Sequence, residues 1–162
     1  MPDNVFGLPV HPLIVHATVV IVPTAALAVI LYALWPKFRD WSGWGPLALS
    51  VAALVLTPLS TSSGESLERR LPHSDDIEKH SQLAGLLIWW VIPLAVLAAV
   101  TFWWHRKDTS RRPGAVKAVL MVLPVLVAAG TLVQVVLIGH SGATASWGDT
   151  PAASSQSSGG DQ

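Results

Sequence analysis

Residues 12–35 read PLIVHATVVIVPTAALAVILYALW and contain no Asp, Glu, Lys or Arg. At a rise of 1.5 Å per residue, a helix of this length extends roughly 36 Å, enough to cross a hydrocarbon core about 30 Å thick. Three further stretches, 44–61, 80–104 and 115–139, are equally apolar, and their one charged residue, Lys117, lies within a turn of its segment's start. None shows the alternating polarity of membrane β-strands. We therefore predict an all-α, integral membrane four-helix bundle.

Composition supports a membrane protein. The 162 residues are 51% hydrophobic and only 12% charged, whereas about a quarter of the residues in soluble domains are charged. The lipid bilayer is thus the expected partner, and the net charge of zero argues against nucleic acid. Cysteine is absent, which excludes disulfides, thiolate metal sites, iron–sulfur ligation and covalent c-type haem.

Lysine and arginine in short loops predict the orientation. Seven basic residues lie in or beside the first and third connections: Lys37, Arg39, Arg106, Lys107, Arg111, Arg112 and Lys117. The second connection has three: Arg69, Arg70 and Lys79. We predict that connections one and three face the cytoplasm and that both termini are extracytoplasmic, in the cell (inner) membrane. Residues 1–143 form the expected transmembrane domain, and 144–162 a flexible tail rich in Ser, Gly and Ala.

Five potential ligands for a metal or a haem fall at the same end of the four predicted helices: His11, His16, Glu65, His80 and His140. His16 is expected about four residues inside the first helix, roughly 6 Å below its start. Gly64 is expected to stop the second helix with a positive φ. His80 is expected to begin the third helix, and His140 to end the fourth. Polar groups are costly in lipid, so their gathering at one membrane face indicates a site.

Each member also has a purely structural interpretation. His16 can be satisfied by a hydrogen bond to a neighbouring helix. His11, among loop prolines, and Glu65 can simply be solvated at the interface. His80 and His140 can be no more than polar helix ends. The prediction depends on the coincidence of the four helix ends, and on no single residue.

A b-type haem suits such a layer. It takes axial imidazoles from two helices that face each other across a bundle. His16 with His80 or His140 would supply that pair. The neighbours expected around it are Trp89 or Trp90 against the ring and Arg69 or Arg70 at the propionates. Electron transfer between a membrane quinol and an outer acceptor would be the matching activity, with membrane or extracytoplasmic redox proteins as partners.

Two alternatives stay open. A zinc or copper site could draw on His11, His16, Glu65, His80 and His140, because both metals accept imidazole and zinc accepts carboxylate. A zinc protease is disfavoured, since no His-Glu-x-x-His run occurs. The third hypothesis is a non-catalytic accessory subunit, in which the polar layer is a hydrogen-bonded knot. Whether the chain is an enzyme is left open.

Two motifs resemble those of a known family. Gly7 to His16 has the form GLPxHPxxVH, and Gly139 to Ala143 has the form GHxGA, followed by Trp147. They resemble a family of bacterial predicted membrane proteins with a four-helix domain of unknown function. In some multidomain members this domain stands beside Rieske or c-type cytochrome modules, which the resemblance offers as context for a redox role. Many relatives continue the closing motif with His-Gly where this chain has Gly148-Asp149, so no role of that later histidine carries over.

Overall fold

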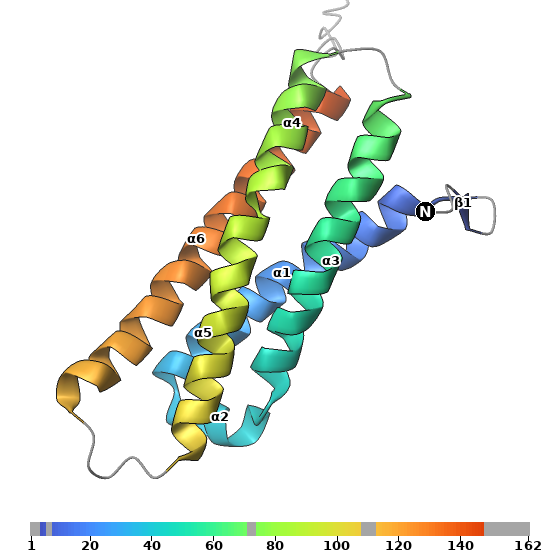
Figure 1. Cartoon of the computed structure of the whole chain (residues 1–162). Coiled ribbons are helices and arrows are strands. Elements are labelled where there is room, and N and C mark those ends of the chain that lie inside the picture. Colours follow the sequence, from blue (N-terminus) through green and yellow to red (C-terminus); the bar gives the residue numbers. More distant parts are fainter. Residues whose placement is uncertain (1–3, 6–7, 71–73, 108–112, 148–162) are drawn as a thin grey trace, which may run out of the picture.

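The computed structural model describes residues 4–5, 8–70, 74–107 and 113–147 (Figure 1). A two-residue antiparallel pairing, β1 (Asn4–Val5) with β2 (Leu8–Pro9), precedes the helices. The helices are α1 (Val10–Leu34), α2 (Pro36–Ser42), α3 (Gly45–Glu68), α4 (Asp75–Leu86), α5 (Ile88–Arg106) and α6 (Gly114–Trp147).

Four helical runs are long and apolar enough to cross a membrane: His11–Leu34, Gly45–Glu68, Asp75–Arg106 and Gly114–Ser146. The third run combines α4 and α5. This confirms the prediction of an all-α fold with four spans.

The spans form a four-cornered bundle. α1 packs along α3 and α6, and α5 packs along the same two helices, so α1 and α5 are diagonal to each other. Because consecutive spans run in opposite directions, the start of α1, the end of α3, the start of α4 and the end of α6 lie at one end of the bundle (Figure 1). We name this the histidine end. The opposite end, formed by the end of α1, α2, the end of α5 and the start of α6, is the basic end.

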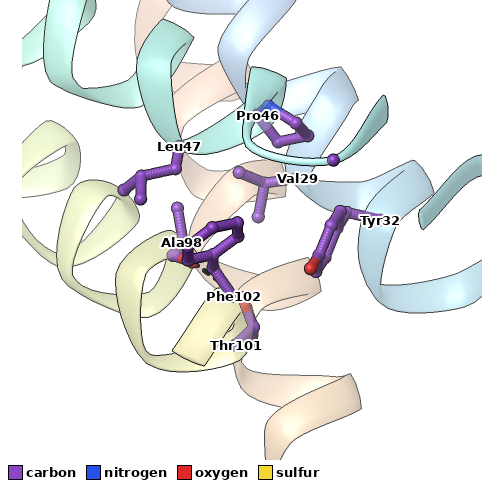
Figure 2. A pocket seen from close by; sticks show the side chains of 8 residues that line it. Val29, Tyr32, Pro46, Leu47, Ala98, Thr101 and Phe102 are labelled. Atoms are coloured by element: carbon purple, nitrogen blue, oxygen red, sulfur yellow. Dashed lines mark hydrogen bonds between the residues drawn. The ribbon is translucent and has the colours of Figure 1, made fainter. Parts of the chain in front are cut away.

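Small side chains line the helix contacts. Ala25, Ala26, Ala53 and Ala128 are fully buried, and Ala98 is nearly so. Lipid tails are as apolar as leucine, so helices in a membrane associate through close packing, which small residues permit. Near the basic end the packing of α1, α3 and α5 leaves a cavity of only about 10 Å³, bordered by residues such as Val29, Tyr32 and Phe102 (Figure 2).

The buried hydroxyl groups of Ser50, Thr57 and Thr131 are satisfied within their own helices. Thr57 and Thr131 each donate to the carbonyl four residues earlier, at 2.8 and 2.9 Å, and buried Ser50 does the same at 2.8 Å. These groups therefore impose no unpaired donor on the apolar interior.

The third span is interrupted at Leu87. The Leu87 N–H bonds to the carbonyl of Ala84, three residues back, and not to that of Leu83. The Leu83 carbonyl accepts a 2.8 Å hydrogen bond from Nε2 of Gln134, a buried residue of α6. A neighbouring helix thus satisfies the backbone group that the break releases, as the membrane interior requires.

Several helix ends differ from the sequence prediction. α3 continues through Gly64 to Glu68, so Gly64 does not stop it. Among the described glycines only Gly43, between α2 and α3, has a positive φ, of 53°. His80 lies in the second turn of α4 and not at the start of a helix. α6 runs past His140 to Trp147, so 144–147 are helical, while 148–162 of the expected tail lie outside the described residues.

Gly130 provides a test of the close packing. A Cβ at this position of α6 would overlap the ring of Trp90, whereas one at Gly139 of the same helix would meet nothing within 4 Å. We expect Gly130→Ala to lower the free energy of unfolding by about 1–3 kcal/mol through overpacking. Gly139→Ala, the matched control, should leave stability equal or slightly raised, because alanine favours helix. Thermal unfolding of the detergent-solubilised variants measures both, and equal stability of the two would contradict the contact.

Candidate functional site

His11 and Ser63 join α1 to α3 at the histidine end. His11 is partly buried, and its Nδ1 lies 2.9 Å from the Ser63 hydroxyl. The ring packs over Gly64, where a Cβ would come within 3.1 Å of the imidazole Cε1. Gly64 is therefore the residue that lets the imidazole approach the α3 backbone.

His80 and Ser141 join α4 to α6 in the same manner. The His80 ring is partly buried, and its Nδ1 lies 3.1 Å from the hydroxyl of Ser141, which is 6% exposed. A Cβ on the next residue, Gly142, would come within 3.0 Å of the His80 Cε1. Both histidines thus lie on a Ser-Gly pair near the end of the partner helix.

The serine hydrogen bonds favour one tautomer of each imidazole. Ser63 Oγ lies 2.9 Å from the carbonyl of Ser60, and Ser141 Oγ lies 2.9 Å from that of Ile138. A hydroxyl that donates its one hydrogen to such a carbonyl accepts from the histidine, so it pairs with Nδ1–H. In that tautomer the lone pair is on Nε2, the form of a metal-ligating histidine whose other nitrogen is fixed by a hydrogen bond.

The two units face the same region. α1 and the α4–α5 span stand diagonally in the bundle, and the His80 ring is near enough to exert an electrostatic effect on His11. We refer to His11 and His80, two partly buried imidazoles on diagonal spans at the same end of the bundle, as the candidate bis-histidine site.

The other three predicted ligands lie differently. His16 is exposed, and its Nδ1 lies 2.6 Å from the Pro12 carbonyl of its own helix. Glu65 and His140 are also exposed. Within the described part of the chain, no three His, Cys, Asp or Glu side chains are grouped as a metal ion would need. The structure therefore leaves His11 and His80 partly buried at the same end of the bundle, and it does not assemble the five-ligand set among the described residues.

The expected neighbours also have definite places. Trp90 packs against Gly130 of α6, and Trp89 is 72% exposed. Arg69 and Arg70 are exposed beyond the end of α3, at the histidine end. The arginines stay candidates for an anionic group there, while Trp90 is already engaged by α6.

A family model described as "Predicted membrane protein (DUF2231)" matches residues 7–153. The chain belongs to this family. The match includes both histidines of the bis-histidine site and both Ser-Gly pairs. No curated protein and no solved structure matches the chain.

In this family member, sequence reasoning missed the two serines. Ser63 and Ser141 each precede a glycine, and each Ser-Gly pair falls near the histidine end of its span. That repeated dipeptide was the available signal. The two glycines of the closing motif differ, since Gly142 contacts the His80 ring whereas a Cβ at Gly139 would meet nothing within 4 Å.

The tautomer assignment predicts an effect of Ser141→Ala. Without the hydroxyl acceptor, His80 should lose its preference for the Nδ1–H form and shift toward Nε2–H. Nitrogen-15 NMR of histidine-labelled protein in detergent distinguishes the two tautomers. Ser146→Ala is the matched control, because Ser146 lies on the same helix and donates only to the Gly142 carbonyl. An unchanged His80 spectrum in Ser141→Ala would contradict the assignment.

Proposed function

We propose that the histidine end binds a b-type haem through His11 and His80 and that the protein carries electrons. The observation that supports this is the pair of partly buried imidazoles on diagonal spans, each with its Nδ1 within hydrogen-bond distance of a serine hydroxyl, which favours a lone pair on Nε2. Preorganised axial imidazoles from two helices are what a haem within a helical bundle requires.

The number of ligands favours haem over zinc. Structural and catalytic zinc sites use three or four protein ligands, and the described residues form no such group. A porphyrin supplies four nitrogen donors itself, so two imidazoles complete the coordination of its iron. Haem then supplies one-electron chemistry, and the chain's contribution is to fix the imidazoles and to limit access of water.

The surroundings agree with this assignment. The site lies at the ends of apolar spans, and Arg69, which follows α3 at the same end of the bundle, is exposed. A cation there would pair with haem propionates directed toward water. With the histidine end on the extracytoplasmic side, the natural electron donors and acceptors are membrane quinols and extracytoplasmic redox proteins.

The direct test is the absorption spectrum of the protein extracted from haem-sufficient membranes. We expect a Soret band and reduced α and β bands, with haem approaching one per chain. His11→Ala and His80→Ala should each lower the haem content at least tenfold. His16→Ala and His105→Ala are the matched controls and should retain it, because both rings bond to carbonyls of their own helices.

The other outcomes point to the alternatives. A colourless protein that contains stoichiometric copper or zinc would indicate a metal-ion site in place of a haem site. A protein that contains neither haem nor metal would favour the accessory-subunit hypothesis. Loss of haem in His16→Ala with retention in His11→Ala would refute the ligand pair.

The orientation is tested independently, because the chain has no cysteine and single cysteines can be introduced. Asp76, at the histidine end, and Asp40, at the basic end, are both exposed. In intact cells or spheroplasts a membrane-impermeant maleimide should label Asp76→Cys and not Asp40→Cys. Lysed cells, in which both should react, serve as the control, and the reverse pattern would invert the proposed topology.

A further inference from the structure

A second, larger cavity lies at the basic end, away from the histidines. Its volume is about 250 Å³, far above the roughly 10–15 Å³ that one water occupies. It is formed where the end of α1, α2, the end of α5 and the start of α6 meet, and its walls include Arg39, Trp104, His105, Lys117, Leu120 and Met121. This cavity is separate from the proposed haem site at the histidine end.

The polar wall of this cavity is basic. Arg39 and Lys117 contribute two permanent positive charges, and His105 adds an imidazole. No acidic side chain is among the described lining residues; the nearby Asp40 of α2 is exposed and does not border the cavity. An anionic group is therefore the complementary ligand.

Arg39 is held in place by the fold. Its Nε donates to the Tyr32 carbonyl at 3.0 Å and its NH2 donates to the Ala33 carbonyl at 3.1 Å. The guanidinium also lies 5.6 Å from the centre of the Tyr32 ring. These contacts stabilise the carboxyl end of α1 and fix a cation at the cavity, so little rotamer entropy remains to be lost on binding.

The apolar wall is formed by α6 and continues along the outside of the bundle. Leu120 and Met121 border the cavity, and Met121 is 46% exposed. Further along α6, Val122, Leu123 and Leu126 are exposed as well. A ligand with an anionic head and a hydrocarbon tail would match both walls, whereas a soluble anion would use only one.

We propose that this cavity binds the phosphate headgroup of an anionic phospholipid, with its acyl chains along the exposed face of α6. Basic pockets between spanning helices are suited to such headgroups when they lie on the side with the excess of lysine and arginine. The basic end carries that excess.

Native mass spectrometry of the full chain in detergent tests this with phosphatidylglycerol and phosphatidylcholine of identical acyl chains. We expect a one-to-one complex with phosphatidylglycerol and much weaker binding of phosphatidylcholine. Lys117→Gln should weaken phosphatidylglycerol binding about fivefold, the effect of one basic residue on an anionic lipid. Lys37→Gln, which removes an exposed charge at the same end but outside the cavity, should change it less than twofold. Arg39 is left intact because it binds α1 carbonyls.

Three results would overturn the proposal. Equal binding of the two lipids would show that the phosphate charge is not recognised. Equal losses in Lys37→Gln and Lys117→Gln would indicate general surface charge. If millimolar inorganic phosphate displaces the lipid fully, and also binds the protein when no lipid is present, the cavity is a site for a soluble anion. The haem content of Lys117→Gln should stay unchanged, so this proposal and that for the histidine end fail independently.

Discussion

Hydrocarbon offers no hydrogen-bond partner, so the bundle itself has to satisfy every polar group inside it. Ser50, Thr57 and Thr131 do this locally, through carbonyls of their own helices. His11, His80 and Gln134 do it across helices, and so decide which helices lie together at which height. Contacts between apolar side chains depend less on the relative height of two helices. A buried hydrogen bond forms at one relative height only, and a shift that leaves either partner unpaired costs about 1–3 kcal/mol.

The same device occurs in both halves of the chain. The hairpin of α1 and α3 places His11 on Ser63 and Gly64, and the hairpin of α4–α5 and α6 places His80 on Ser141 and Gly142. In each hairpin the first span contributes the imidazole, and the second span contributes the serine hydroxyl and the glycine over which the ring packs. Parallel repeats of this kind are familiar in membrane transporters, related by an axis along the membrane normal. Here the similarity lies in contacts, because the matched residues are few and the intervening side chains differ.

The two ends of the bundle have opposite chemistry. The histidine end holds imidazoles that are oriented by serines of α3 and α6, which suits coordination. At the basic end Arg39 and Lys117 gather around a cavity, which suits anions. The antiparallel course of the spans explains why the two sets of residues are separated. It places the first and third connections at the basic end, and the second connection with the outer ends of the first and last spans at the histidine end.

The sequence by itself determined the four spans, because unbroken apolar runs of this length are stable only as helices in lipid. It also determined that His11, His16, His80 and His140 share one end, since that follows from counting spans. It could not determine which histidines meet: only packing decides whether a ring turns inward, as at His11 and His80, or outward, as at His16 and His140. For the same reason Gly64 suggested a helix stop, although it serves as the contact surface of an imidazole that lies 53 residues earlier in the chain. Tertiary structure decides such pairings because a residue's partner across a bundle depends on the rotation and height of two helices, which local sequence does not encode.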